Sequence, residues 1–522
     1  MRCAIALAAV AVALASQVHT QRLPSPPVLP GAIGPLHHPI RTTVPEAQRL
    51  FDQGLTLHYG FNREGARRSF AVAAALDGTA AMPRVGLALS FGPNLNTDAS
   101  PADVAAGCAA ARQASTLARD ARERAYATAL VLRYCQGLSL DSGTEYAIEM
   151  GTLFQASADD PDAATLYAES LLMLQPRSGE QQAELVAVLE MVLARWPSHP
   201  GANHYYIHAV EGSASPQRGL AAARRLETLV PAVGHLLHMP SHIYARMGDH
   251  ERAIAANERA VAANLAYSKQ NPGDLEYRLY FDHDLESLAM ALGAAGYLAR
   301  ARHAAAMRIG AHASGPRSAH ASSPIELFVL LRFGRWEEVL GMRAPPPGDP
   351  SRALHHFALA TAYAKLRRTA QADGERGAFG REAAAAPPQA TYRSNPWRAV
   401  LQAYTAILDA RLAAGRGQTA AALAAWRQAV AFQDRLVYHE PAPVYYPTRE
   451  SLGAALYLAG QYDDAERVFA ADLVRNPRSG RSLFGLWKAR VSLGSGGDAD
   501  AAERQFREVW GKSDVTLSLD DY

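Results

Sequence analysis

Cysteine, excess charge and long apolar stretches are all scarce in this sequence. Lys and Arg total 52 against 50 Asp and Glu, and only 3 of the 522 residues are cysteine. With a formal net charge of +2 and no basic run, the sequence indicates neither nucleic acid nor an anionic membrane surface as a partner. After the N-terminus, no segment approaches the roughly 18 apolar residues of a membrane-spanning helix. We therefore expect no membrane span in the body of the chain.

Runs of β-branched residues are scarce as well, which argues against a β-rich fold. Alanine is abundant, and 39 glycines and 31 prolines punctuate the apolar segments. The composition, 49% hydrophobic and 20% charged, is ordinary for a soluble folded protein. A chain of this length accommodates several domains or one elongated repeat array. The sequence predicts an all-α protein.

The few cysteines leave two interpretations open. Cys3 lies in the N-terminal apolar stretch, so Cys108 and Cys135 are the pair that remains after it. In an oxidising compartment these two could form a bridge across a helical hairpin; otherwise they are two buried thiols. Nothing else with metal-ligand chemistry lies close to them in sequence, so we do not expect them to bind a metal.

The N-terminus has the pattern of a secretory signal. Met1-Arg2 supplies one positive charge, and the apolar stretch that follows ends near Ala15. Cleavage after Ala15 or after Thr20 fits the small residues there. We assign residues 1–20 to a signal peptide and expect a secreted or periplasmic protein; an uncleaved anchor is the alternative. Residues 21–44 are rich in Pro, Gly and His and predict an extended leader, with the His37-His38 pair on a solvated tail.

A repeat pattern organises the rest of the chain. The letters GDHERA at residues 248–253, followed by Ala260, resemble the tetratricopeptide repeat, a helix–turn–helix of about 34 residues with small residues where its helices cross. The same register fits Gly54 with Ala66, and Gly453 with Phe469. The resemblance covers residues 46–510 and implies an all-α superhelical solenoid of stacked helix hairpins, without a separate catalytic domain. We expect N-terminal repeats at 45–195, central repeats at 196–310 and C-terminal repeats at 311–522.

The strongest chemical signal is a pair of histidine-rich segments, HYYIHAVE at residues 204–211 and HLLHMPSH at residues 235–242. Side chains three, four and seven residues apart share one face of a helix. Clustered imidazoles with a carboxylate suit copper, zinc or iron. Two such rows are predicted: His204, His208 and Glu211, and His235, His238 and His242.

The repeat register places these rows on one surface. In tetratricopeptide arrays that bind ligands, particular places of each first helix line the concave groove, and the resemblance puts both rows on those places. His283 and Glu286 take the same places in the following repeat. Pro240 either kinks the helix between His238 and His242 or begins a new helix. Both interpretations keep His242 in the groove.

A narrower resemblance concerns the motifs themselves. HYYIHAVE, HMPSHIYAR and the later NPRSGRSLFGLWKA are similar to motifs of a group of exported bacterial tetratricopeptide proteins to which no activity is attached. In that pattern we would expect another histidine near Glu286. A carboxylate here implies either a carboxylate ligand or an altered site.

The chemistry divides into hypotheses of different classes. A metal-dependent enzyme with copper or zinc, or alternatively iron, would hold its metal through His204, His208, His235, His238, His242 and His283. A copper pair with three imidazoles each suits oxidation, whereas a zinc site with Glu211 or Glu286 as general base suits hydrolysis of a small-molecule or peptide ligand. The alternative is a peptide- or protein-binding scaffold without catalysis, and the sequence leaves open whether the protein is an enzyme. The long His or Cys tracts of metal storage are absent.

Histidines outside the central stretch receive a plainer interpretation. We expect His199, His250, His303, His312 and His320 to act as hydrogen-bonding residues. His355, His356 and His439 could reach the groove but lack the supporting register.

Overall fold

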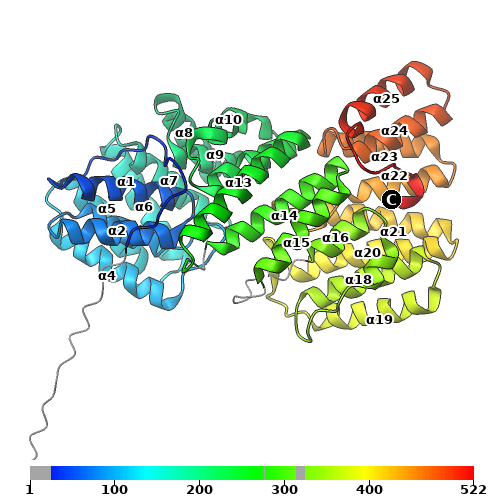
Figure 1. The fold of residues 1–522 in the computed structure, drawn as a ribbon, viewed down its shortest axis with the longest axis horizontal. Coiled ribbons are helices and arrows are strands. Elements are labelled where there is room, and N and C mark those ends of the chain that lie inside the picture. Colours follow the sequence, from blue (N-terminus) through cyan, green and yellow to red (C-terminus); the bar gives the residue numbers. More distant parts are fainter. Residues whose placement is uncertain (1–24, 275–276, 313–323) are drawn as a thin grey trace, which may run out of the picture.

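The computed structural model describes residues 25–274, 277–312 and 324–522. The predicted signal peptide and His320 lie outside the described residues. Within them the chain is almost entirely helical, and its one small sheet pairs β1 (Thr391–Tyr392) with β2 (Asn395–Pro396) in an antiparallel hairpin. Consecutive helices form antiparallel hairpins that follow one another along the long axis of the molecule (Figure 1). The predicted all-α, tetratricopeptide-like solenoid is confirmed.

The N-terminal part of the solenoid comprises the first eight helices. They are α1 (Pro45–Tyr59), α2 (Arg63–Leu76), α3 (Met82–Ser90), α4 (Pro101–Leu117), α5 (Ala121–Tyr134), α6 (Leu140–Ala156), α7 (Pro161–Met173) and α8 (Gly179–Arg195). Local sequence explains several of their starts. Ser100, Ser139 and Ser178 each form a capping box, and proline occupies the first turn of α1, α3, α4 and α7, where its missing N–H costs nothing.

The central helices carry the predicted histidines. They are α9 (Pro200–Glu211), the short 3-10 helix η1 (Pro216–Gly219), α10 (Leu220–Leu229), α11 (Gly234–His238), α12 (Pro240–Arg246), α13 (His250–Gln270), α14 (Arg278–Ala295) and α15 (Leu298–His312). In Figure 1, α13 and α14 run between the N-terminal and C-terminal parts. Residues that contact α14 therefore come from both.

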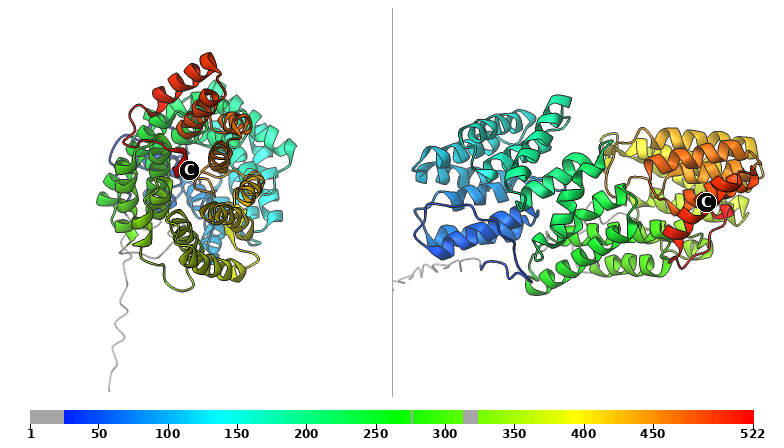
Figure 2. Two further views of the ribbon diagram at one scale, coloured as in Figure 1. Left: turned by 90° about the vertical axis from the view of Figure 1, so that its right-hand side faces the viewer. Right: turned by 90° about the horizontal axis from the view of Figure 1, so that it is seen from above.

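The C-terminal part completes the array. Its helices are α16 (Ile325–Arg332), α17 (Trp336–Leu340), α18 (Ser351–Lys365), α19 (Thr369–Ala385), α20 (Trp397–Gly415), α21 (Thr419–Gln433), α22 (Thr448–Leu458), α23 (Tyr462–Arg475), α24 (Gly480–Ser492), α25 (Gly496–Trp510) and η3 (Leu519–Asp521). Two continuous hydrophobic cores follow the stack, one from Ile40 to Phe333 and the other from Leu327 to Tyr522. The further views in Figure 2 show that the helices wind around the long axis. No helix within the described ranges is long and apolar enough to cross a membrane.

Glycine makes the closest helix crossings possible. A Cβ on Gly54 would lie 2.7 Å from the Phe70 ring, and one on Gly86 would lie 2.4 Å from it. Far along the chain, Gly453 and Gly485 stand in the same relation to the Phe469 ring, with distances of 2.7 and 2.2 Å. The same contact in an early and a late hairpin agrees with the close helix crossings predicted at Gly54 and Gly453.

The disulfide and the leader both take a definite form. Cys108 and Cys135 are bridged across the α4–α5 hairpin, so the first of the two interpretations holds. The leader is extended, but it is not a solvated tail. Ala232 donates its backbone N–H to the carbonyl of Ala32 over 3.1 Å, and His38 is only 3% exposed. The prediction for His38 was wrong because Pro/Gly composition reveals an extended chain and not the surface against which it packs.

Candidate metal centre

Four central helices bring the six predicted histidines together. His204 and His208 lie one turn apart on α9, while the neighbouring α11 and α12 carry His235, His238 and His242. His283 approaches from α14. Pro240 is the first residue of α12, and Met239 forms the joint between α11 and α12. The interpretation that a helix begins at Pro240 is therefore confirmed.

The histidines divide into two trios. We call His204, His208 and His235 the first trio; a potential ligand atom of each lies within 4.8 Å of the other two. His204 Nε2 and His235 Nε2 are 3.2 Å apart. The Nε2 atom of His208 is buried and has no hydrogen-bond partner in the described structure. Buried polar atoms are normally paired, so an unpaired imidazole nitrogen that faces other imidazoles is the feature expected of a metal ligand.

The second trio consists of His238, His242 and His283, whose ligand atoms also lie within 4.8 Å of one another. His238 Nε2 lies 2.7 Å from His242 Nε2 and 3.1 Å from His283 Nε2. Zinc binds imidazole nitrogen at about 2.0–2.1 Å, so neighbouring ligands of a tetrahedral ion lie about 3.3 Å apart. The 3.2 Å between His204 and His235 and the 3.1 Å between His238 and His283 come close to that value, whereas the 2.7 Å between His238 and His242 is shorter.

Hydrogen bonds on the other ring nitrogens orient the imidazoles. His204 Nδ1 donates to the carbonyl of Tyr59 over 2.6 Å, and His238 Nδ1 donates to the side-chain oxygen of Asn257 over 2.6 Å. His208 Nδ1 donates over 2.8 Å to Glu211, and His242 Nδ1 bonds to the same carboxylate. A neutral imidazole that donates through Nδ1 presents a lone pair at Nε2. The Nε2 lone pairs of these four histidines therefore face the interior of the trios, an arrangement that a cation stabilises.

Burial keeps most of these imidazoles neutral. His204, His235 and His238 are fully buried, and burial, reinforced by the neighbouring histidines, holds the pKa of each well below its ordinary value. Burial also disfavours charge on His242, but the Glu211 carboxylate outweighs this and raises the pKa of His242. In return, the two histidines beside Glu211 hold its pKa well below the usual range despite burial. Neutral imidazole is the form that binds metal.

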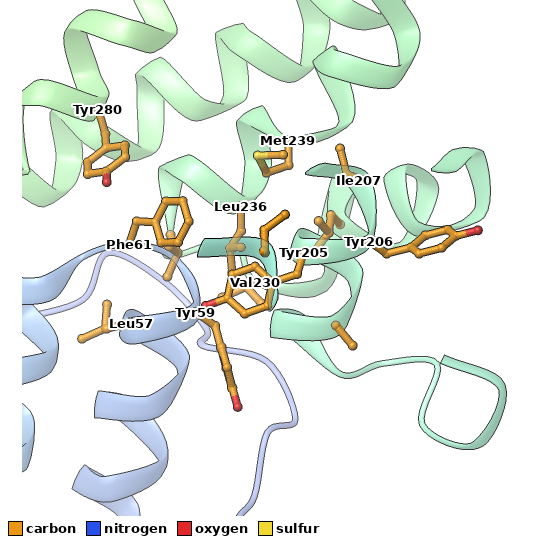
Figure 3. Close-up of a cluster of buried hydrophobic side chains, with 14 of the residues drawn as sticks. Leu57, Tyr59, Phe61, Tyr205, Tyr206, Ile207, Val230, Leu236, Met239 and Tyr280 are labelled. Atoms are coloured by element: carbon orange, nitrogen blue, oxygen red, sulfur yellow. The ribbon is translucent and has the colours of Figure 1, made fainter. Parts of the chain in front are cut away.

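Aromatic side chains enclose the first trio. The Phe61 ring lies 4.5 Å from the His204 ring and 5.0 Å from the His235 ring, and the Tyr280 ring lies 4.9 Å from that of His235. Figure 3 shows Phe61 between Tyr280 and Tyr59. This apolar wall excludes water and lowers the local dielectric, which strengthens every electrostatic interaction in the centre.

The two predicted carboxylates occupy different positions. Glu211 lies between the trios, and both of its oxygens accept from histidines. Glu286 instead forms a buried ion pair with Arg393, whose side chain also donates to the carbonyl of Ala442. Arg393 lies in the turn of the β1–β2 hairpin with a positive φ of 50°. Glu286 therefore anchors the C-terminal part to α14 and joins neither trio.

A cavity of about 730 Å³ lies on the Nδ1 side of His238, and its lining residues include no histidine of either trio. Its wall includes Asn257 and Ser241, both within reach of His238 Nδ1. The lining also includes the segment between α21 and α22, where the Tyr438 hydroxyl donates to Glu440 over 3.2 Å. Burial raises the pKa of Glu440. A cavity of this size accommodates a small organic molecule.

Sequence reasoning missed the groups that support the trios. Asn257 lies one turn before Ala260 on α13 and belongs to no recognisable sequence motif. The carbonyl of Tyr59 contacts His204 across 145 residues of sequence, and Arg393 contacts Glu286 across 107. His204 was recognisable in the sequence, but no local pattern signals a backbone acceptor that far away.

A second buried cluster lies where the leader meets α7, and we call it the leader cluster: His38, Asp160, Asp162 and His199. His38 Nδ1 and His199 Nε2 bond to opposite oxygens of Asp162 over 2.9 and 3.0 Å. Asp160 caps α7 and accepts from the Tyr126 hydroxyl. His199 Nδ1 accepts from the backbone of Ala202, so its Nε2 carries the proton. Both oxygens of Asp162 are already satisfied within this ion-pair network, whereas His38 Nε2 is buried without a hydrogen-bond partner in the described structure.

The remaining histidines are scattered. The predicted hydrogen-bonding role of His199 is confirmed in the leader cluster. His250 lines the cavity at the start of α13, and its buried Nδ1 lacks the expected hydrogen-bond partner in the described structure. His356 pairs with Glu375. His439 also lines the cavity. The side chain of His312 lies outside the described residues.

Comparison with known proteins yields only distant likeness: no family model and no curated protein matches the chain. Among solved structures, it is similar to the human IFIT1 dimer with m7Gppp-AAAA, at 10% identity over 90% of this chain and 91% of that one, with a TM-score of 0.33. The TPR domain of P58(IPK) matches at 11% identity over 86% of this chain and 98% of that one, with a TM-score of 0.23. TM-scores this low carry no argument about function.

Proposed function

We propose that this protein binds two transition-metal ions, one in each trio, and that the ions are copper. The observation that supports this is the convergence of Nε2 atoms from six histidines whose Nδ1 atoms, where their partners are described, are turned outward to acceptors. Sites made of imidazole alone do not suit magnesium, calcium or manganese, which prefer oxygen. Among the metals that accept imidazole, copper has the highest affinity, with zinc as its main competitor.

We further propose that the metal pair serves an oxidative enzyme. Copper supplies one-electron redox chemistry when it is bound. The two carboxylates expected to act as base in a hydrolytic zinc centre, Glu211 and Glu286, are both engaged with other side chains. The cavity beside Asn257 and Ser241 provides room for a small-molecule substrate, and the aromatic wall around Phe61 protects the centre from water.

The peptide-binding scaffold is the less favoured function. A scaffold has no need of six clustered histidines, four of which are oriented by hydrogen-bond acceptors. Burying unpaired polar nitrogens costs free energy that metal binding would recover. No described feature marks a groove for an extended peptide in preference to the cavity.

Metal analysis tests the proposal. Protein purified from its native host without added chelator should contain about two copper ions per chain by inductively coupled plasma mass spectrometry. His238→Ala should lower that content, whereas His303→Ala, on the exposed face of α15, should leave it at about two. Protein that stays metal-free and gains no thermal stability from copper, zinc or iron contradicts the proposal. Two zinc ions in place of copper would retain the site and exclude the oxidative role.

We also propose that the mature protein is exported, to the periplasm or the medium. The charged and apolar N-terminus supports this, and the Cys108–Cys135 bridge suits an oxidising compartment. Intact-mass measurement of protein from the native host should show a chain that begins after Ala15 or Thr20. A cytoplasmic protein that retains Met1 would contradict it.

A further inference from the structure

Glu211 touches one histidine from each trio. Its Oε1 accepts from Nδ1 of His208 over 2.8 Å, and its Oε2 bonds to Nδ1 of His242. The three residues bring their ligand-type atoms within 4.8 Å of one another. Glu211 is 9% exposed and ends α9, whereas His242 belongs to α12. One carboxylate therefore connects two sites that are carried by different hairpins.

This connection has two physical consequences. Both oxygens of Glu211 are held by ring N–H groups, so the orientation of one imidazole fixes the carboxylate and, through it, the other imidazole. A cation on Nε2 of His208 makes Nδ1–H a stronger donor and orders Glu211 more firmly. The second ion then finds His242 already oriented and bears less of the ordering cost.

Charge acts in the same direction. Two cations a few ångströms apart in a buried centre repel each other strongly, because the local dielectric is low. The Glu211 carboxylate lies between His208 and His242, which would face the two cations. A negative charge at this position offsets part of that repulsion. A neutral side chain of the same shape would leave that repulsion in place.

We propose that Glu211 is a positioning residue that couples the two metal sites, so that they fill as a pair and not one after the other. This inference rests on the proposed two-ion function. It assigns Glu211 to the space between the sites and gives it no contact with substrate.

The test is a binding cycle with zinc alone as the probe. His204→Ala leaves the second trio and His238→Ala leaves the first, and competition with a chromophoric chelator gives the zinc affinity of each single site. The overall two-zinc constant of the unmutated protein, divided by the product of the two single-site constants, is the coupling factor. We expect a factor of about ten or more.

The same cycle is then repeated with Glu211→Gln in all three proteins. The coupling factor should fall to about one or below, because the amide cannot accept from both rings and carries no charge. A purely structural role for Glu211 would weaken both sites and leave the factor unchanged. Asn257→Ala is the matched control, since Asn257 orients His238 of the second trio only, and it should lower affinity while the factor persists.

The outcomes separate the two claims. If neither single-trio protein nor the unmutated protein binds zinc, the proposed two-ion function fails. If two zinc ions bind with a coupling factor of about one or below in the unmutated protein, only the role of Glu211 fails. A factor that survives Glu211→Gln also overturns it. If Glu211→Gln does not fold, as judged by its helical circular dichroism, the coupling factors of the unmutated protein and of Glu211→Asp still test the role of Glu211.

Discussion

Tyr59 touches both buried histidine clusters, and the comparison between them is informative. Its hydroxyl donates to Asp162 in the leader cluster over 2.7 Å, while its carbonyl accepts from His204 in the first trio over 2.6 Å. In the leader cluster one ring nitrogen of each histidine, Nδ1 of His38 and Nε2 of His199, bonds to the Asp162 carboxylate. In the trios the Nε2 atoms face one another, and the ring protons of His204 and His238 point outward.

The difference shows that proximity alone does not identify a metal site. Both clusters bring ligand-type atoms within the same 4.8 Å of one another. In the leader cluster Asp162 already accepts from His38, His199 and Tyr59, so its negative charge is compensated by groups of the chain itself. In the trios imidazole nitrogens meet imidazole nitrogens, and an added cation would satisfy their lone pairs. Four predictions test this contrast, in order of decreasing effect.

The largest effect should come from breaking the leader cluster. His38→Ala leaves the buried Asp162 short of a charged partner, and removal of one member of a buried ion pair typically costs about 3 kcal/mol or more. Urea unfolding of metal-free protein should show this loss of unfolding free energy. The variant should nevertheless bind as many metal ions as the unmutated protein. Loss of metal binding in the folded variant would show that the leader cluster is itself a metal site.

The next effect concerns the trios. Metal at a free concentration of about 100 times Kd should raise the unfolding free energy by about 2.7 kcal/mol per site. His208→Ala, His238→Ala and His283→Ala should each lose much of this gain, while far-UV circular dichroism stays the same. Differential scanning calorimetry with and without copper measures it. An undiminished gain in all three variants would contradict the assignment of the trios.

Acid should affect the two clusters in opposite directions, by smaller amounts. The hydrogen bond and the attraction to Asp162 raise the pKa of His38 despite burial. The protonated imidazole therefore stabilises the folded state fully below about pH 6.5, and this contribution is lost as the pH rises through the folded pKa. Burial lowers the pKa of His235, so metal-free protein loses stability as the pH falls below about 6.5. Urea unfolding of His38→Gln and His235→Gln between about pH 5 and 8.5 gives the slope of the unfolding free energy against pH. The two substitutions should change this slope in opposite directions. A change in the same direction in both variants would refute the contrast between the clusters.

The smallest effect is expected at His250. This histidine lines the cavity from the start of α13, and burial lowers its pKa to about 4. It contributes to neither trio, so His250→Ala should leave metal content and metal affinity unchanged. Isothermal titration with zinc gives both values. A clear loss of zinc affinity would show that His250 contributes to the metal centre and that the centre extends toward the cavity.

Local sequence was enough to predict the fold class and to single out the histidines. Apolar spacing and small residues such as Gly54 and Gly453 specify stacked hairpins, because only a side chain of that size admits the Phe70 and Phe469 rings. The helical period placed His204 and His208 on one face. These are consequences of local geometry, which neighbouring residues suffice to define. Binding of an ion by these residues stays a prediction.

The grouping of the histidines depends on how distant helices pack. The sequence placed His235 in one row with His238 and His242, yet it joins His204 and His208, and His283 completes the other trio. The break at Met239 and the stacking of α9, α11, α12 and α14 produce this exchange. The burial of His38 and the pairing of Glu286 with Arg393 have the same origin. A helical period fixes which residues share a face, but contacts between segments far apart in the sequence fix which faces meet.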